Sequence, residues 1–553
     1  MKKELTMKHT FENQFHIKED FMKILILFLL CLPCLLKADV QLVKNGKAAA
    51  SIVIPSNWKT VKYEKIHIYE TEINSQAKRL VEYIKRSTGA ELPICTKAEG
   101  AQIQFVQAAP GTMDIEGFSF TFPSKDKVVI TVNGQRSLQY AVSEFLERYL
   151  GVRWIFPTEL GTVIPKHSNV IIPAKEVRMQ PSYLGRYLAG GNNKVPHVDA
   201  YYRWMLDNKG NFLERGGHPN HNLLNLLPVA KYGKSNPEFY PILNGKRHIP
   251  TQKIHWQPCF TEPSVIDAVV SNIPADAKRV SLGVNDGEGF CECSRCIAID
   301  GKKINRVGQI DRTRSYLMFC NAVARKRPDV EFWINAYWCV LEYPEGIKLE
   351  PNLRYAIAYE STQFADPDRF NRIKILMDKW QKASGNPLSW YDYLYGGRYL
   401  FPRIFAKFLG NNLKWRYQNN VRFLTGEYYP DGKWTDSINI YVAMKVLWDI
   451  NADIDALIDD YCITAVGEKA APYLKKYFEY NEKIWTSPKM LKASDFAKET
   501  TYFSVGNGYL TRFPDDYVDR CEELLKKVLE LSNSKERAKY FYDKFNEIKP
   551  HLL

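Results

Sequence analysis

The middle of the chain repeats one pattern that constrains its fold: a short apolar run, typical of a buried strand, followed closely by an acid. Residues 279–284 form such a run and Asp286 follows it; similar junctions occur at Glu360, Asp392 and Glu427. Buried apolar strands separated by helical stretches predict a parallel sheet. In parallel α/β folds the reactive groups gather at the carboxyl ends of the strands, so these four acids are the candidate catalytic residues.

The strand pattern predicts the architecture. Between residues 181 and 448 about eight strand-like runs alternate with helical stretches, which is the strand count of a TIM-type (β/α)8 barrel. They begin near Tyr183, Asn222, His255, Val280, Phe332, Tyr355, Leu388 and Phe423. The α/β chain is therefore expected to have a small N-terminal α/β domain (39–175), a central barrel (176–450) and a C-terminal helical region (451–553).

The first 38 residues predict export. Residues 22–38 have a positively charged start, a short apolar core and a small residue at the end, as in a secretory signal peptide, and residues 1–21 before Met22 suggest an over-extended gene start. The apolar core is too short to cross a bilayer, so no transmembrane span is expected. Cys31 or Cys34 offers an alternative lipid anchor, although cleavage is favoured. We expect a periplasmic or cell-surface protein of a Gram-negative-type bacterium.

The net charge and the aromatic content limit the classes of molecule that the protein is expected to bind. The formal net charge is +14, which suits nucleic acid or anionic glycans, but no basic run or nucleic-acid motif concentrates it. Nucleic acid is therefore not expected as a partner, and a solvated basic surface is the simplest explanation. Aromatic residues make up 13% of the chain, and their rings can stack on the faces of sugars or fill cores. Together with the acids, they favour a carbohydrate-active enzyme with a glycan or glycoprotein substrate.

Aromatic side chains flank several of the candidate acids, as in residues 390–393. An acid beside aromatic walls tends to have a raised pKa because it is desolvated, which a general acid requires. The alternative for each is a buried acid held by a backbone amide or an arginine. Glu360 is the first choice for proton donor, with Asp286 or Asp392 as the ionised partner. The candidate substrate contacts are Trp390, Tyr391, Tyr428, His218, His221, Asn285 and Arg186.

Cysteines form one dense cluster, with Cys291, Cys293 and Cys296 within six residues. Zinc needs a fourth ligand, and none lies nearby in the sequence. Because an exported protein meets oxidising conditions, a local disulfide or loop staple is favoured over a metal. These cysteines are therefore expected to be structural, with neither a metal nor another cofactor bound.

Several separate stretches together resemble one family. They begin at Tyr140, Gly151, Gly217, Asn236, Asn285, Trp390 and Tyr441. The sequence resembles the domain-of-unknown-function family 4838, part of which is classified as glycoside hydrolase family 163, over nearly all of residues 40–490. The resemblance implies an N-terminal domain similar to that preceding the barrels of hexosaminidases and α-glucuronidases. It also implies endo-β-N-acetylglucosaminidase activity on N-glycans, with motif positions at His218, Asp286, Glu360, Asp392 and Glu427.

One motif departs from the family pattern, and this departure leaves open which substrate the protein acts on. The glutamate after the sixth strand is commonly followed by cysteines in the family, whereas Glu360 is followed by Ser-Thr-Gln-Phe. Two alternatives therefore stay open beside the N-glycan enzyme. One is another glycosidase, acting on uronic-acid or other complex glycans, and the other is a non-catalytic glycan-binding surface protein.

Overall fold

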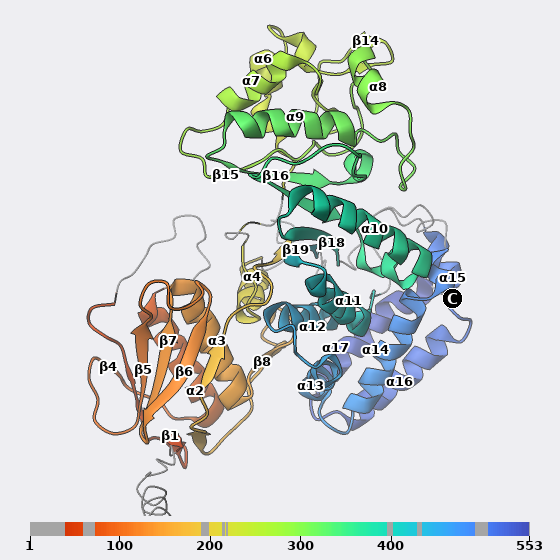
Figure 1. The fold of residues 1–553 in the computed structure, drawn as a ribbon. Helices are drawn as coiled ribbons and strands as arrows, with labels where there is room; N and C mark the ends of the chain where they lie inside the picture. The colour runs from red at the N-terminus through yellow and green to blue at the C-terminus, as the bar shows by residue number, and fades with distance from the viewer. Residues whose placement is uncertain are drawn as a thin grey trace, which may run out of the picture.

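A computed structural model describes residues 39–58, 72–189, 198–212, 216, 219–394, 402–428, 434–492 and 507–551. The expected gene start and signal peptide therefore lie outside the described residues, as does His218. Figure 1 shows an N-terminal sheet with helices α2 and α3 packed on it, a central sheet covered by helices, and a group of C-terminal helices beside it. No helix in the described ranges combines the length and apolarity needed to cross a membrane.

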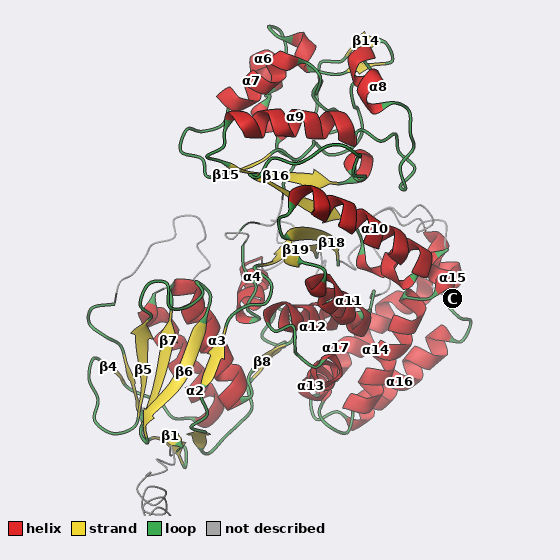
Figure 2. Ribbon diagram, viewed as in Figure 1, coloured by secondary structure: helices red, strands yellow, loops and turns green. Residues whose placement is uncertain are grey.

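The N-terminal part is built on a mixed six-stranded sheet of order β11-β6-β7-β5-β3-β4 (Figure 2). Alternation in β7 buries Val128, Ile130 and Val132 against the helices. Because β11 pairs with β6, this sheet extends past residue 175. Its elements are β3 (Ser51–Val53), α2 (Ile73–Thr88), β4 (Ile94–Cys95), β5 (Gln102–Gln107), β6 (Phe118–Ser124), β7 (Lys127–Val132), α3 (Gln135–Leu150) and β11 (Val177–Met179).

Short strands surround this domain. A three-stranded sheet has the order β10-β1-β2, and β8 pairs with β9. These short strands lie at the edge of the N-terminal domain. After them the chain leaves the domain toward the central sheet. The bounds are β1 (Val40–Lys44), β2 (Lys47–Ala48), β8 (Arg153–Trp154), β9 (Thr162–Val163) and β10 (Val170–Ile172).

The central sheet has six parallel strands in the order β12-β19-β18-β17-β16-β15. The first strand along the chain pairs with the last, so the sheet curls as part of a barrel does. Helices α9, α10 and α11 precede β16, β18 and β19. The bounds are β12 (Gly185–Ala189), β15 (Arg279–Ser281), α9 (Thr313–Lys326), β16 (Glu331–Ala336), β17 (Leu353–Ala358), α10 (Pro367–Ser384), β18 (Leu388–Tyr393), α11 (Ala406–Gln418) and β19 (Val421–Glu427).

The described residues form six of the eight strands expected for a closed barrel. Near Asn222 only a single parallel bridge is present, between His221 and Gly283. Near His255 there is no strand in the described part of the chain, because His255 has a φ of 62°, which extended backbone does not allow. Its amide instead bonds the carbonyl of Asp286 at 2.8 Å. The central sheet is therefore a curled half-barrel.

Short elements occupy the segment between β12 and β15 and the loop after it. In Figure 1, α6, α7, α8 and α9 lie together on the outer side of β15 and β16. The additional elements are α4 (Val198–Asp207), α5 (Leu223–Leu226), α6 (Val229–Tyr232), β13 (Ile242–Leu243), β14 (Lys246–Arg247), α7 (Pro263–Ser271) and α8 (Ser294–Asp300).

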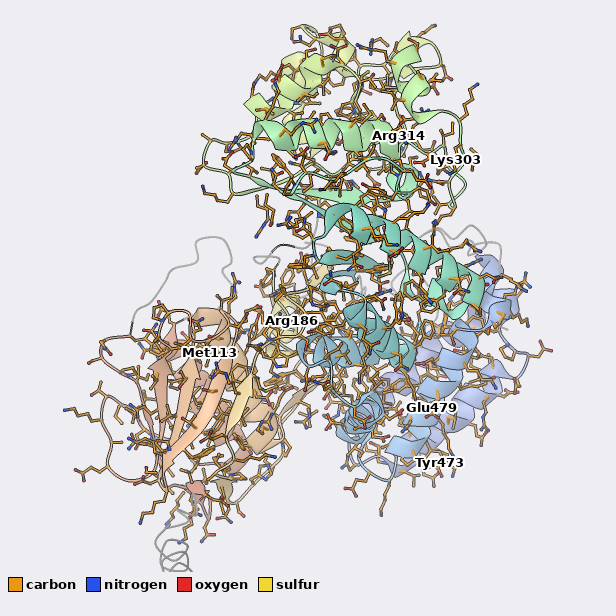
Figure 3. All side chains as sticks on the ribbon, viewed as in Figure 1. Met113, Arg186, Lys303, Arg314, Tyr473 and Glu479 are labelled. Atoms are coloured by element: carbon orange, nitrogen blue, oxygen red, sulfur yellow. The ribbon has the colours of Figure 1, made fainter. Side chains whose placement is uncertain are left out.

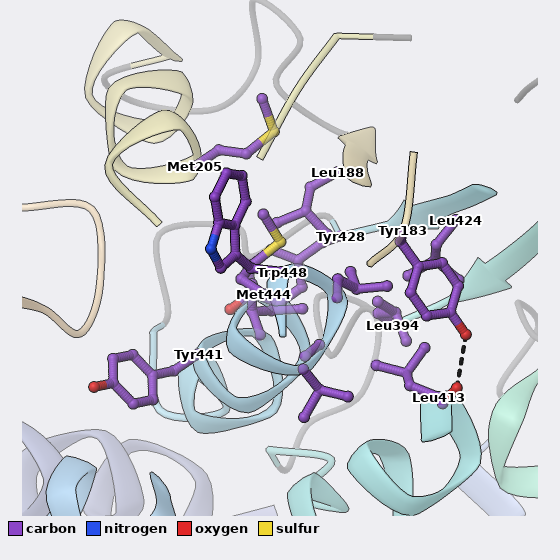
Figure 4. Close-up of a cluster of buried hydrophobic side chains, with 14 of the residues drawn as sticks. Tyr183, Leu188, Met205, Leu394, Leu413, Leu424, Tyr428, Tyr441, Met444 and Trp448 are labelled. Atoms are coloured by element: carbon purple, nitrogen blue, oxygen red, sulfur yellow. Dashed lines mark hydrogen bonds between the residues drawn. The ribbon is translucent and has the colours of Figure 1, made fainter. Parts of the chain in front are cut away.

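Helix α12 (Ser437–Trp448) joins the sheet to the C-terminal helices, and every residue in it except Lys445 is buried. Figure 4 shows Met444 and Trp448 of this helix in one apolar cluster with Leu188 and Leu424 from β12 and β19. A helix that is apolar all round must be covered on all sides, and the remaining helices cover it. They are α13 (Ile454–Val466), α14 (Ala471–Trp485), α15 (Pro488–Leu491), α16 (Tyr517–Leu531) and α17 (Lys535–Ile548).

Candidate active site

A cavity of about 380 Å³ opens at the carboxyl ends of the central strands. Two larger cavities, of 490 and 740 Å³, lie elsewhere, and neither is lined by a candidate acid. The cavity at the strand ends brings together two of the four acids, one histidine and three tyrosines. Its lining consists of Pro219, Asn220, His221, Asp286, Asn335, Tyr337, Ala356, Ala358, Tyr391, Tyr393 and Glu427.

Strand alternation explains this lining. Side chains two residues apart share one face of a sheet, so Tyr391 and Tyr393 of β18 face the cavity together. The register places Ala358 opposite Tyr391, and Tyr393 opposite Glu427. The small alanine on β17 leaves space, while the tyrosines on β18 form a wall. The cavity is thus a consequence of which residues share the inner face.

Asp286 stands at the cavity mouth on the loop after β15. Its side chain is 52% exposed, and its Oδ1 accepts a hydrogen bond from the Tyr337 hydroxyl at 3.2 Å. His221 Nε2 lies 3.9 Å from the same oxygen. His221 Nδ1 lies 2.5 Å from the Val284 carbonyl, which can only accept, so this contact places the proton on Nδ1 and turns Nε2 toward Asp286.

Glu427 ends β19 on the other side of the cavity. Its Oε1 accepts a hydrogen bond from the Tyr391 hydroxyl. Tyr391 also packs against Tyr393, with ring centroids 5.4 Å apart in an edge-on arrangement. Each carboxylate in the cavity therefore has a phenol as hydrogen-bond partner. Two positioned carboxylates facing one cavity are the groups that glycosidic bond cleavage requires.

Glu360 does not reach this cavity, contrary to its expected role as the acid facing the substrate. Strand β17 ends at Ala358, and Glu360 caps the 3-10 helix η3 (Ser361–Ala365). Its carboxylate is fully buried, is ion-paired with Arg403 and accepts a hydrogen bond from Thr362 Oγ1 at 2.6 Å. Glu360 is therefore a buried acid held by an arginine, which is the alternative to a catalytic role given above for each of these acids.

Asp392 is also buried away from the cavity. It alternates with Tyr391 and Tyr393 along β18 and so projects to the opposite face of the sheet. Arg416 Nη1 donates to its Oδ2 at 2.7 Å, and the Ser361 amide donates to its Oδ1 at 2.9 Å. The environment is a complete buried ion pair, because Ser361 Oγ also donates to the carboxylate.

Trp390 shares this outer face and is fully buried, so it does not contact a ligand in the cavity. Its indole nitrogen donates to the Tyr359 carbonyl at 2.8 Å, and the Arg416 guanidinium lies 4.2 Å from the ring centroid. The expected sugar contact is instead part of the packing between the sheet and α11.

Arg186 connects two parts of the molecule. It is fully buried on the outer face of β12 and makes two bonds to Glu116 of the N-terminal domain, at 3.0 and 3.1 Å. Figure 3 shows Arg186 where the N-terminal domain meets the central part. This side chain joins the domains and does not contact a substrate in the cavity.

Two further expected contacts are structural as well. Tyr428 is buried and donates to Asp436 Oδ1 at 2.9 Å. Asn285 is buried, donates to the Trp256 carbonyl at 3.0 Å and accepts from the Leu224 amide at 2.7 Å. Asn285 thus holds the backbone from which Asp286 projects. Of the expected substrate contacts in the described residues, His221 and Tyr391 line the cavity.

Sequence reasoning missed several cavity residues, including Asn335, Tyr337 and Tyr393. A signal for Asn335 was present, because a buried polar residue interrupts the apolar run of β16. Its Oδ1 accepts from the Val284 amide at 3.1 Å and so positions the loop before Asp286.

Sequence reasoning also missed Cys259, whose sulfur lies beside those of Cys291, Cys293 and Cys296. The expectation that the cluster lacks a fourth ligand is corrected by this neighbour.

Several solved structures similar to this chain are glycoside hydrolases. A family GH115 4-O-methyl-α-glucuronidase, BtGH115A, with specificity for decorated arabinogalactans, has a TM-score of 0.53 at 12% identity, over 92% of this chain and 72% of that one. A family 89 glycoside hydrolase from Clostridium perfringens has a TM-score of 0.48 at 9% identity, over 89% and 64%. A β-N-acetylhexosaminidase from Bacteroides fragilis has a TM-score of 0.41 at 12% identity, over 75% and 90%.

At these identities the similarity to BtGH115A shows a shared fold and nothing finer. No curated protein sequence matches the chain. The sequence pattern of one family matches residues 156–479, which include the central sheet, the cavity and the first C-terminal helices. Because this match spans more than half of the chain, the protein belongs to the family described as Domain of unknown function (DUF4838).

Proposed function

We propose that this protein is a glycoside hydrolase that cleaves β-linked N-acetylglucosamine within N-glycans. The observation that carries the proposal is the pair Asp286 and Glu427, which line one cavity at the carboxyl ends of parallel strands. Glycosidases need a proton donor and a second carboxyl group beside the scissile bond. The shared fold with glycoside hydrolases supports the reaction class, and the family resemblance supports the N-glycan substrate.

Glu427 is the proposed proton donor. As the bond between C1 and the glycosidic oxygen breaks, its carboxyl proton passes to that oxygen, and the acetamide oxygen of the substrate attacks C1 to form an oxazolinium ring. Water then attacks C1, the ring opens, and the Glu427 carboxylate takes the proton from water. Tyr391 holds the Glu427 carboxyl in place through its hydroxyl.

Asp286 is the proposed partner of the acetamide. As an anion it accepts a hydrogen bond from the acetamide N–H and stabilises the positive charge that develops on the ring. Tyr337 donates to Asp286 Oδ1 and holds the carboxylate in position for this role. Tyr393 and His221 complete the wall on which the sugar rests.

The first prediction tests the acid pair. Glu427→Gln and Asp286→Asn should each reduce cleavage of an N-glycosylated glycopeptide by about 10²–10⁴-fold, because each removes a proton-transfer or charge-stabilising group. Released glycans are measured by mass spectrometry, and thermal unfolding should stay close to that of the wild type. A cyclic thiazoline that mimics the oxazolinium ring should inhibit the wild type and bind Asp286→Asn more weakly.

Two outcomes would replace this proposal. If both variants retain wild-type turnover, the acid pair is wrong. If the wild type binds glycans but cleaves none, the chain is a glycan-binding protein without catalysis. The uronic-acid alternative has less support in the cavity, because among the described lining residues there is no arginine or lysine to bind a carboxylate.

We also propose that the chain is exported to the periplasm or cell surface, where glycoprotein substrates are accessible. The support is the signal-like pattern of residues 22–38. Cell fractionation and sequencing of the mature N-terminus test export, and labelling with a fatty acid distinguishes cleavage from a lipid anchor at Cys31 or Cys34.

A further inference from the structure

Four cysteine sulfurs lie close together at the start of helix α8, which is found between β15 and α9 along the chain. Their ligand atoms all lie within 4.8 Å of one another. Cys291 and Cys293 come from the loop that follows Asp286, Cys296 lies in the first turn of α8, and Cys259 comes from the segment before α7. Cys259, Cys291 and Cys296 are buried, and Cys293 is half-buried. Such a cluster outside the cavity calls for a function of its own.

The sulfur separations fit a tetrahedral ion. Cys259 Sγ lies 3.8 Å from Cys293 Sγ and 3.9 Å from Cys296 Sγ. Four thiolates bound to zinc at about 2.3 Å are roughly 3.8 Å apart at tetrahedral angles. A disulfide instead needs a sulfur separation of about 2.05 Å. The arrangement therefore resembles the ligand set of a metal and not a pair of disulfides.

The surrounding backbone supplies donors suited to thiolates. The Ile242 amide donates to Cys291 Sγ at 3.3 Å, and the Cys296 amide donates to Cys293 Sγ at 3.5 Å. Thr261 Oγ1 lies 3.2 Å from Cys296 Sγ. Outer hydrogen bonds of this kind orient the ligands of a metal and offset their negative charge. Cys293 also caps α8, which fixes the Cys293-x-x-Cys296 turn.

We propose that Cys259, Cys291, Cys293 and Cys296 bind one zinc ion in a closed structural site. Four protein thiolates leave no open position for water or substrate, so the ion would stabilise the fold and take no part in the reaction. It would tie the turn at Cys259 and the β13–β14 hairpin to the loop from 285 to 293. That hairpin already bonds the loop, with the Glu292 amide donating to the Ile242 carbonyl at 2.8 Å. Because this loop carries Asp286, the zinc would also support one side of the cavity.

Zinc binding at this cluster does not depend on the proposed reaction. The alternative is that the four thiols are oxidised to disulfides. Export would expose the four thiols to conditions that favour disulfides. The two outcomes differ in metal content, in the number of reactive thiols and in mass, since each disulfide removes two hydrogens. These readouts are independent of activity.

The experiment uses the full chain purified without a metal-affinity step. Elemental analysis should find one zinc per chain, and four thiols should become reactive only after a chelator is added. Replacement by Co²⁺ should give the thiolate-to-metal charge-transfer absorption of a tetrahedral sulfur site. Cys259→Ser should lose the zinc, whereas Cys95→Ser, a half-buried cysteine outside the cluster, should retain it.

Direct measurements on the wild type keep the inference testable if Cys259→Ser fails to fold. Two disulfides found by peptide mapping, four reactive thiols without metal, or stoichiometric iron in place of zinc would each overturn it. Zinc at one equivalent that protects four thiols would support it. Removal of zinc should then lower the melting temperature and should make the loop from 285 to 293 more accessible to protease.

Discussion

Two pairs of acids lie at or near the carboxyl ends of parallel strands of the same sheet, yet they lie in opposite environments. Asp286 and Glu427 face the cavity, where each accepts a hydrogen bond from a tyrosine. Glu360 and Asp392 are fully buried, and each is ion-paired with an arginine. The position of an acid at a strand end therefore decides only that it lies near the functional edge of the sheet. The face on which it projects decides whether it meets a substrate or the core.

The difference has a physical cause in strand phase and strand length. Asp392 lies one position from Tyr391, and a shift of one residue moves a side chain to the other face. Glu360 has the phase of Ala358, which faces the cavity, but the strand stops before it and the chain turns into η3. A buried acid needs a charge partner, and Arg403 and Arg416 provide it.

The largest expected effect comes from the buried pair. Glu360→Gln and Asp392→Asn should each destabilise the protein by about 3–5 kcal/mol, because each removes the carboxylate opposite a buried guanidinium. Glu427→Gln and Asp286→Asn, which alter groups that line the cavity, should cost well under this amount. Urea denaturation of the four variants measures the difference.

The comparison fails if the two pairs exchange behaviour. A Glu360→Gln protein that is as stable as the wild type but has lost all cleavage would return the proton donor to Glu360. A matched variant, Arg403→Met, separates the roles, since it leaves the Glu360 carboxylate in place but removes its charge partner. It should destabilise the protein by a similar amount.

Asp436 sharpens the comparison, because it is a buried acid that, among the described residues, forms no ion pair. Burial raises the pKa of Asp436 to about 7, and the hydrogen bond from Tyr428 only partly opposes this. The folded state thus holds the proton to higher pH than the unfolded state, whose aspartate pKa is about 3.9. Stability from this group is complete below about pH 4 and is lost as the pH rises through about 7, by up to roughly 4 kcal/mol.

Asp436→Asn tests this sign directly. The variant should lose that part of the pH dependence, so its stability relative to the wild type should improve between pH 4 and pH 8. Thermal melts across this pH range measure the difference. If the stability of both proteins depends on pH in the same way, Asp436 is ionised in the folded state and must be stabilised by a nearby positive charge.

Much of the site's location, but less of its composition, could be predicted from the sequence. The apolar runs predicted the strands that carry Asp392 and Glu427, and their ends meet at one edge as parallel strands require. Period-two alternation was available to place Trp390 and Asp392 together, away from Tyr391. The partners of the buried acids were not predictable, because Arg403 is 43 residues from Glu360 along the chain. Cys259 likewise joins its cluster only in space.

The smallest expected effect separates two tyrosines, one in β18 and one directly after β19. Tyr391 reaches into the cavity and donates to Glu427, whereas Tyr428 is buried and donates to Asp436. Tyr428→Phe should cost about 1 kcal/mol of stability through the lost hydrogen bond and leave turnover unchanged. Tyr391→Phe should leave stability nearly unchanged and lower kcat by roughly tenfold, or about 1.4 kcal/mol in the barrier, because Glu427 loses the group that orients it.

The two tyrosine variants remove the same atom from side chains of the same type, so each is the control for the other. Melting temperature and kcat are measured on both, with the glycopeptide at saturating concentration. A drop in kcat for Tyr428→Phe without loss of stability would bring the outer face of the sheet into the reaction. Equal kcat for Tyr391→Phe and wild type would mean that the phenol is not needed to position Glu427, and the acid role would then rest on the carboxylate alone.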